Sequence, residues 1–516
     1  MRLLWHDYRY FPYERMLALR EARLLFGKQP EDDGDALRLN CSPAAGLVKR
    51  LTYFKAAEVA GRTLIPDQAT LEASGNGNGQ GWDQDSEPIP SLRRQSTRYS
   101  AHGLHEYRGK FNPQVVRAIG NLLGFAPGAW VFDPFCGSGT TLLEAAHIGW
   151  NAIGIDINPL AVLIANAKIA AFNASPANLA HESNAIEKRL TPIPDGSDWR
   201  EHLPEPEYLE KWFPVSVLIQ LRAILRAIEK AKPTPLQDVF RVVLSDICRE
   251  VSLQDPGDLR IRRRKNPADN YPAVKMFLDS LRARVASIVR ARQHVQPKAG
   301  TQQQAVFADT RYAARTVRVF LRNRRRQVFD GAITSPPYAT AMPYLDTQRL
   351  SLALLGLMGS RELRNGEKKL IGNREIQDKE RSNLEGQIEA NAAELPDAVI
   401  AFCRKLLNLA DHATHGFRRR NVPALAYKYL ADMASMFGSV LEVIRSKGRY
   451  ALLVGRNSTE LRGQEILIDT PQLLATVAES RGWQVEEMLS FETYHRYDVH
   501  QSNSIREEVL VILRAP

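Results

Sequence analysis

The sequence predicts an α/β chain built on a doubly wound, Rossmann-like sheet, with a helical insertion and a small N-terminal extension. Short apolar strands alternate with helices from residue 130 onward, which is the pattern of a parallel sheet with crossover helices. A glycine-containing loop, CGSG, joins the first of these strands to its helix. The 516 residues, 44% of them hydrophobic, suffice for a sizeable core and for more than one domain.

The elements of this sheet can be placed along the chain. The first strand is expected at WVFD, residues 130–133, and the next at NAIGID, residues 151–156, with the helix TTLLEAAHIG between them. Strand character returns at AVFADT and QVFDGAI and again near the end of the chain. The closing elements are expected to be strand YALLVG (450–455), helix TPQLLATVAESRG (470–482), and strands VEEMLSFE (485–492) and EEVLVILR (507–514), the last two as an antiparallel pair at the sheet edge.

Composition divides the rest of the chain. Residues 173–300 read as helices with one apolar stripe, from Val217 to Ile228, and residues 360–395 are so charged that we expect a mobile or ligand-ordered insert. The stretch 75–91 has the composition of a flexible linker. The expected division is 1–95, an N-terminal extension and linker; 96–172, the first half of the sheet domain; 173–300, the basic helical insertion; 301–359, the second half; 360–400, the charged insert; and 401–516, the remainder of the sheet.

Charge and cysteine content narrow the class of protein. The net charge is +11, which favours a polyanionic partner. The four cysteines form no CxxC pair, and no apolar run has the length of a membrane span or of a signal peptide. We therefore expect a cytoplasmic protein without a membrane partner, a disulfide framework or a structural zinc site.

Two basic runs are candidates for phosphate contact. Residues 258–298 hold eleven Lys or Arg against three Asp, and a second run lies just before the strand QVFDGAI. Solvated helix faces are the alternative explanation. The candidate nucleic-acid-binding residues are Arg260, Arg262, Arg263, Arg264, Lys265, Arg324 and Arg325.

The loop after the first strand suits a ligand. In DPFCGSGTT, Gly137 and Gly139 allow the backbone close to a bound group, and the following helix offers free amides. No GK[ST] follows, so the loop is not a Walker loop. Asp156 ends the second strand, where its carboxylate can accept hydrogen bonds from the two hydroxyls of a ribose. A helix N-cap is the alternative role for Asp156.

The stretch ITSPPY, residues 333–338, ends another strand in a stiff loop. Two consecutive prolines can neither continue a helix nor donate to a sheet ladder. The loop therefore presents Ser335 and Tyr338 rigidly at the end of the strand.

Read together, DPFCGSGTT, GIDINP and TSPPY resemble the S-adenosylmethionine-dependent amino-methyltransferases that act on DNA bases. The resemblance covers most of residues 96–356 and, more weakly, the closing strands. It implies a methyltransferase sheet with S-adenosyl-L-methionine as cofactor. FADT resembles the acidic strand end that contacts the cofactor's adenine, and HEYRGKFNPQVVRAI resembles the segment that packs over its methionine end. The implied cofactor-binding residues are Asp133, Pro134, Phe135, Gly137, Gly139, Thr140, Asp156, Ile157, Asp309, Lys110 and Phe111.

The same resemblance gives the proline loop a catalytic role. The Ser335 hydroxyl and the Pro336 carbonyl would accept the hydrogens of an exocyclic base amine, and Pro337 would help to hold them rigid. Tyr338 would stack on a base flipped out of double-stranded DNA. In this family Ser at the first motif position accompanies cytosine N4 methylation more often, whereas Asp or Asn often accompanies adenine N6 methylation. The sequence thus predicts a site-specific DNA methyltransferase, with cytosine N4 favoured, in a restriction-modification or defence system with a possible nuclease partner.

Two other functions remain open. Some tRNA guanosine N2-methyltransferases share the fold, the motif order and a PPY-type loop, but they usually carry an N-terminal RNA-binding domain, for which residues 1–95 look short and irregular. A DNA-binding protein on a decayed methyltransferase scaffold is disfavoured by the intact motifs. His102 and His105 show no third metal ligand in the sequence, so we expect no metal.

Overall fold

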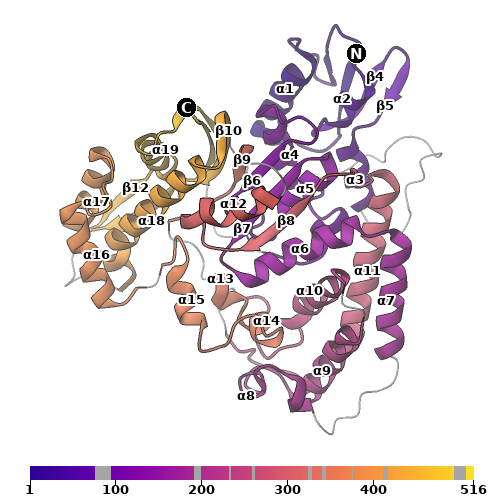
Figure 1. Cartoon of the computed structure of the whole chain (residues 1–516), viewed down its shortest axis with the longest axis vertical. Helices are drawn as coiled ribbons and strands as arrows, with labels where there is room; N and C mark the ends of the chain where they lie inside the picture. The colour runs from indigo at the N-terminus through magenta and orange to yellow at the C-terminus, as the bar shows by residue number, and fades with distance from the viewer. Residues whose placement is uncertain are drawn as a thin grey trace.

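The computed structural model describes residues 1–75, 95–107, 109–190, 199–231, 234–258, 262–323, 328–339, 344–374, 376–410, 417–492 and 507–516. Its centre is a seven-stranded sheet of order β13-β14-β10-β9-β6-β7-β8 (Figure 1). The strands are β6 (Trp130–Asp133), β7 (Asn151–Asp156), β8 (Gln303–Phe307), β9 (Phe329–Thr334), β10 (Ile444–Gly455), β13 (Gln484–Glu492) and β14 (Glu507–Arg514).

Five neighbouring strands, from β8 to β10, are parallel, while β14 is antiparallel to both β10 and β13. The predicted fold class and the predicted edge pair are therefore confirmed. In a parallel sheet all carboxyl ends lie at one edge, so the loops after Asp133, Asp156, Phe307 and Thr334 meet there.

Alternating side chains divide the sheet between two cores. Val131 and Ile333 belong to one apolar cluster, whereas their chain neighbours Phe132 and Ala332 belong to the other, as a period of two requires. The first cluster includes helices α4 (Pro113–Leu122), α5 (Thr140–Ile148) and α6 (Pro159–Asn173), and the second includes α12 (Ala313–Asn323), α18 (Phe417–Leu441) and α19 (Thr470–Ser480).

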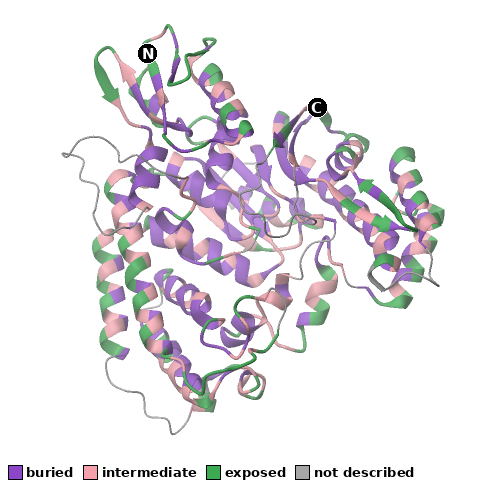
Figure 2. Cartoon of the chain, turned by 180° about the vertical axis from the view of Figure 1, so that it is seen from behind, coloured by how far each residue is buried: buried purple, intermediate pink, exposed green. Residues whose placement is uncertain are grey.

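The helical insertion packs against the sheet domain through α6. The predicted stripe from Val217 to Ile228 is buried in α9 (Val215–Glu229), which confirms it as core. Figure 2 shows green, exposed faces along the outer helices of this part. Its other elements are α7 (Pro176–Leu190), η2 (Trp199–His202), α8 (Pro206–Leu209), α10 (Leu236–Cys248) and α11 (Ala273–His294).

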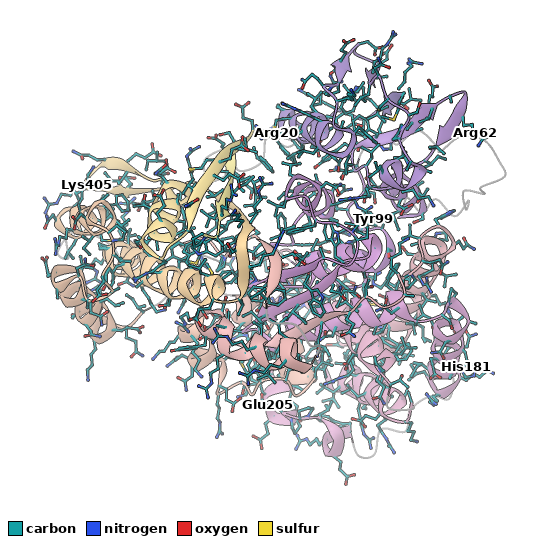
Figure 3. All side chains as sticks on the ribbon, turned by 45° about the horizontal axis from the view of Figure 1, so that its top comes forward. Arg20, Arg62, Tyr99, His181, Glu205 and Lys405 are labelled. Atoms are coloured by element: carbon teal, nitrogen blue, oxygen red, sulfur yellow. The ribbon has the colours of Figure 1, made fainter. Side chains whose placement is uncertain are left out.

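The N-terminal extension is more regular than the sequence suggested. Residues 1–75 form a five-stranded antiparallel sheet of order β2-β3-β1-β4-β5, so the expectation of an irregular segment is wrong. Arg20 of helix α1 pairs with Glu487 of β13 at 2.8 Å, where the two sheets meet (Figure 3). The elements are β1 (Arg2–Trp5), α1 (Pro12–Phe26), β2 (Glu31–Asp32), β3 (Ala36–Arg38), α2 (Ala45–Lys49), β4 (Phe54–Val59), β5 (Arg62–Leu64) and α3 (Asp67–Gly75).

The charged segment 360–395 also contains regular structure where we expected a mobile or ligand-ordered insert. It forms α15 (Leu363–Lys369) and α16 (Asp378–Ala390), whose few apolar side chains, such as Leu384 and Ile388, are buried. The remaining elements nearby are α13 (Tyr344–Thr347), α14 (Arg349–Leu354), α17 (Asp397–Leu409), β11 (Asn457–Leu461) and β12 (Gln464–Ile468).

Most of the predicted linker at 75–91, and the segment 493–506 between the last two strands, lie outside the described residues. Within the described parts of the chain, no single helix is long and apolar enough to cross a bilayer. Only α6 and α7 taken together, bent by 120°, have the required length and composition.

Candidate active site

A cavity of about 420 Å³ opens at the carboxyl edge of the central sheet. It brings together twelve of the fifteen residues that the sequence assigned to catalysis or cofactor binding. Asp133, Gly139 and Thr140 do not line the cavity. The lining predicted residues are Lys110, Phe111, Pro134, Phe135, Gly137, Asp156, Ile157, Asp309, Ser335, Pro336, Pro337 and Tyr338.

Gly139 shapes the glycine loop from behind the cavity. It is the N-cap of α5 with φ at 76°, and a Cβ there would lie 2.6 Å from Ala165 Cβ. Lys168, on the same helix as Ala165, is fully buried and donates from Nζ to the carbonyl of Ser138 at 2.9 Å. Burial holds the pKa of Lys168 well below its usual value. The loop is therefore held against α6 by close packing and by this hydrogen bond.

Asp133 connects the glycine loop to the Ser-Pro-Pro-Tyr loop. Its Oδ1 accepts hydrogen bonds from Thr334 Oγ1 at 2.6 Å and from the backbone amide of Phe135 at 3.1 Å. Burial raises the pKa of Asp133 to about 6. Because Thr334 directly precedes Ser335, this bond fixes the end of β9 relative to β6.

Asp156 lies at the end of β7 on the cavity wall. Its Oδ2 accepts from the Gly137 amide at 3.0 Å and its Oδ1 from the Asn158 amide at 2.8 Å. The N-cap of α6 is Asn158, not Asp156, because the Asn158 side chain accepts from the Leu160 amide. Burial raises the pKa of Asp156 to about 6. Each carboxylate oxygen keeps a second lone pair for a ligand hydroxyl.

Asp309 lines the cavity after β8 but is also paired. Its carboxylate accepts from Arg311, with Nη2 to Oδ2 at 2.6 Å, and Arg311 also reaches Asp432 and the Lys369 carbonyl. Asp309 further caps the short helix η3 (Thr310–Tyr312). Arg311 thus joins the end of β8 to α18 and to the end of α15.

Lys110 and Phe111 form the opposite wall. Lys110 donates to the Thr97 carbonyl at 2.6 Å and, more weakly, to the His102 carbonyl at 3.4 Å. Burial lowers the pKa of Lys110 to about 7. No carboxylate among the described residues forms an ion pair with this ammonium group, which therefore suits an anionic group such as the carboxylate of an amino acid.

The Ser-Pro-Pro-Tyr loop, predicted to be catalytic, follows β9 directly. Ser335, Pro337 and Tyr338 are partly exposed to the cavity, while Pro336 is buried. The Tyr338 hydroxyl donates to Glu508 Oε1 at 2.9 Å, which fixes the orientation of the tyrosine ring.

Sequence reasoning missed several cavity residues. Tyr13 comes from the N-terminal extension and stacks on Phe491 of β13 with ring centroids 4.8 Å apart. Tyr344 lies in α13, shortly after the Ser-Pro-Pro-Tyr loop, and Glu508 is the second residue of β14. None of these residues belongs to a recognisable motif. For Tyr344 and Glu508, the only indication in the sequence was their position close to a predicted strand of the central sheet. The lining residues not predicted include Tyr13, Tyr107, Asn112, Tyr344, Lys369, Leu453, Phe491 and Glu508.

The histidines of the sequence analysis lie in buried networks outside the cavity lining. Glu144 Oε1 accepts from Tyr99, His102 and His147 at 2.9 to 3.0 Å, and Oε2 pairs with Arg117. Tyr99 lies in the interior between the N-terminal extension and α5 (Figure 3). His102, Glu144 and His147 have metal-like spacing, but the Arg117 guanidinium on the same carboxylate opposes a second cation. His105 instead contacts Ser245 at 3.0 Å.

The residues around the cavity fit the implied cofactor. S-adenosylmethionine carries a carboxylate, which suits Lys110, and ribose hydroxyls, which suit the free lone pairs of Asp156. Gly137 has a positive φ of 48°, which residues with a side chain rarely adopt, so the cavity wall beside Asp156 carries no side chain at this position.

We expect Gly139→Ala to lower the free energy of unfolding by roughly 2–4 kcal/mol, because alanine at a positive φ is strained and its Cβ would overlap Ala165. The matched control is Gly438→Ala within α18, where a Cβ meets no atom within 4 Å. That control substitution should raise the free energy of unfolding by about 0.5–1 kcal/mol. Urea unfolding of both variants measures the difference; equal stabilities would contradict the packing argument.

The affinity for S-adenosylhomocysteine, which shares the ribose and the carboxylate, should be highest between about pH 6 and pH 7. Below that window Asp156 takes up a proton and loses acceptor capacity for the ribose. Above it Lys110 loses the charge that attracts the carboxylate. Calorimetric titration across pH 5 to 9 measures the loss of affinity on both sides of this window. The Lys110→Met variant should no longer lose affinity at alkaline pH but should still lose it at acidic pH.

The predicted nucleic-acid residues do not gather at the cavity. Arg260, Arg324 and Arg325 lie outside the described residues. Arg262 pairs with Asp258 at 3.3 Å, Arg264 donates to the Gln254 carbonyl at 3.0 Å, and Lys265 is exposed. Arg263 is exposed and lies over the Trp212 ring, at 5.6 Å, while Arg349 of α14 lies 4.9 Å from the same ring. Trp212 thus contacts arginines of both the basic insertion and α14.

Comparison with known proteins agrees with the geometry. Residues 63–167 match the family model described as DNA methylase, for N6 and N4 methyltransferases. Type II methyltransferase M.MjaII of Methanocaldococcus jannaschii is 46% identical over 72 residues, 14% of this chain and 13% of the relative. Type II methyltransferase M.MvaI of Kocuria varians is 25% identical over 275 residues, 51% of this chain and 59% of the relative.

A tRNA (guanine(10)-N2)-dimethyltransferase of Methanothermobacter thermautotrophicus is 40% identical over 52 residues, 10% of this chain and 16% of the relative. The matches thus span from 13% to 59% of these relatives' own lengths. The matched segment, the sheet order and the convergent motifs agree with one another. Residues 63–167 are therefore similar to the N6/N4 DNA methylases, and this similarity implies S-adenosylmethionine as the methyl donor.

Proposed function

We propose that this protein is a site-specific DNA methyltransferase that methylates an exocyclic base amine, cytosine N4 in preference to adenine N6, within a restriction-modification or defence system. One observation carries the proposal: the Ser-Pro-Pro-Tyr loop lies in the same cavity as Gly137 and Asp156. The amine acceptors and the cofactor residues are then close enough for direct transfer.

The mechanism follows from this chain's own groups. Ser335 Oγ and the Pro336 carbonyl accept the two amine hydrogens and draw the nitrogen toward tetrahedral geometry, which frees its lone pair. Bound S-adenosylmethionine supplies an electrophilic methyl group on a sulfonium. Thr334, held by Asp133 at 2.6 Å, keeps the acceptors in place, and Tyr338 stacks on the flipped base. After transfer the amine loses one proton to solvent through the Ser335 side of the loop.

Double-stranded DNA is the proposed partner, held in part by the basic insertion. Arg263 and Lys265 are exposed there, and the Arg263–Trp212–Arg349 stack leads toward the catalytic segment. Exposed Arg315, Arg318 and Arg322 on α12 lead into the second basic run. Backbone contacts of this kind give strongly salt-dependent binding.

A tRNA guanosine N2-methyltransferase is the second candidate. Two observations favour it: the short match to a tRNA methyltransferase, and the five-stranded sheet of residues 1–75, which removes the expectation that this region is too irregular for a domain. Ser335 argues against it, because the tRNA enzymes usually have Asp at that position.

A label-transfer assay tests the proposal. The protein is incubated with methyl-labelled S-adenosylmethionine and either mixed-sequence duplex DNA or total tRNA, and digested nucleosides are identified by mass spectrometry. N4-methylcytosine in DNA is the expected product. N6-methyladenine in DNA would keep the class of enzyme and change the base, whereas methylguanosine in tRNA would overturn the proposal.

A further inference from the structure

Glu508 is a half-buried acid in the cavity lining that the mechanism above does not use. It is the second residue of β14, opposite Gly455 of β10 and Phe491 of β13. Its neighbour Glu507 faces the other side of the sheet and pairs with Arg456. Glu508 instead lines the cavity beside Ser335 and Tyr338.

The carboxyl group of Glu508 is hydrogen-bonded at one oxygen, and its burial and this hydrogen bond shift its pKa in opposite directions, with burial the larger effect. Oε1 accepts from Tyr338, and among the described residues Oε2 has no hydrogen-bond partner. No described Lys or Arg lies within ion-pair distance of it. Burial raises the pKa of Glu508. A neutral acid with Oε1 occupied by Tyr338 has its proton available on Oε2.

The edge of a flipped base offers such a proton a specific acceptor. When Ser335 and Pro336 hold an exocyclic amine, the next ring atom is N3 in cytosine or N1 in adenine, and both are unprotonated acceptors. On the Watson–Crick edge of guanine the atom beside the amine is N1–H, a donor, which would oppose a donated proton. One carboxyl group at this position can therefore distinguish the two classes of base.

We propose that Glu508 reads the Watson–Crick edge of the flipped base, as a neutral carboxylic acid that donates to N3 of cytosine or N1 of adenine. This inference rests on the proposed function, because it assumes that the base enters the cavity with its amine at Ser335. It assigns Glu508 a role in base specificity that no motif carries. Tyr13 and Phe491 close the same side of the cavity with a stacked aromatic pair.

The test removes the two partners of the proposed hydrogen bond one at a time: the ring nitrogen of the base and the carboxyl group of Glu508. Duplexes carry either the natural target or its deaza analogue, 3-deazacytosine or 1-deazaadenine, at the position found by the label-transfer assay. Single-turnover transfer is measured for the wild type, Glu508→Ala, Glu508→Gln and Tyr338→Phe. Unchanged cofactor affinity and circular dichroism establish that each variant is folded.

In the wild type the analogue should lower the single-turnover rate by about 10- to 100-fold, the effect of leaving a donor in the closed site unpaired. Glu508→Ala should methylate both duplexes at equal rates, and Glu508→Gln, whose amide can donate, should retain part of the discrimination. Tyr338→Phe should keep it, since the carboxyl group remains. An analogue penalty as large in Glu508→Ala as in the wild type would overturn the inference and leave Glu508 as a positioning residue for Tyr338.

Failure of the proposed function gives a different result. In that case the label-transfer assay with the wild-type protein gives labelled guanosine in tRNA and no label in DNA. That result also overturns a donating Glu508, because guanine presents N1–H at this edge.

Discussion

Replacing Ser335 by alanine should slow methyl transfer by about 10²- to 10³-fold, the loss typical of one preorganised polar group at a reacting centre. The affinity for S-adenosylmethionine should not change, because Ser335 touches the amine and not the cofactor in this mechanism. Single-turnover rates and calorimetric titration of the cofactor separate the two effects.

Ser335→Asn is the matched control, since its amide oxygen is an acceptor at the same position. It should retain more activity than the alanine variant. Full turnover by Ser335→Ala would show that the catalytic assignment is wrong, and a parallel loss of cofactor affinity would place the hydroxyl at the cofactor instead.

Replacing Asp156 by alanine should weaken cofactor binding by about 10- to 100-fold, because a charged acceptor for ribose hydroxyls is lost. The change also releases the Gly137 and Asn158 amides, which Asp156 now holds at 3.0 and 2.8 Å. We therefore expect a lower unfolding temperature as well as a higher Kd.

Asp156→Asn separates these two consequences. The amide oxygen still accepts one hydrogen bond, so this variant should recover more stability than affinity. Calorimetry and thermal unfolding on the same samples give the comparison. Wild-type affinity in Asp156→Ala would exclude Asp156 from the cofactor site.

The position of the first insert shows why the Ser-Pro-Pro-Tyr loop lies so far along the chain from the glycine loop, while the second insert follows the Ser-Pro-Pro-Tyr loop. The helices α7 to α11 enter between β7 and β8, and α13 to α17 enter between β9 and β10. Both insertions therefore lie in connections between parallel strands, and they leave the order of the seven strands in the sheet unchanged.

The sequence by itself determined the strands of the central sheet, the glycine loop and the proline loop. These features depend on local pattern: strand ends at Asp133 and Asp156, glycine at positive φ, and paired prolines after Thr334. The parallel topology then follows from helices between strands and brings the loops to one edge.

Only the tertiary structure decided the rest of the site. The strands of residues 1–75 include segments of two and three residues, too short for any period to show, and they are stabilised by pairing partners distant in the chain. Lys168 beneath the glycine loop, Tyr13 against Phe491, and Glu508 against Tyr338 are likewise contacts between residues distant in sequence. Such contacts arise from packing of the complete fold, which local pattern does not encode.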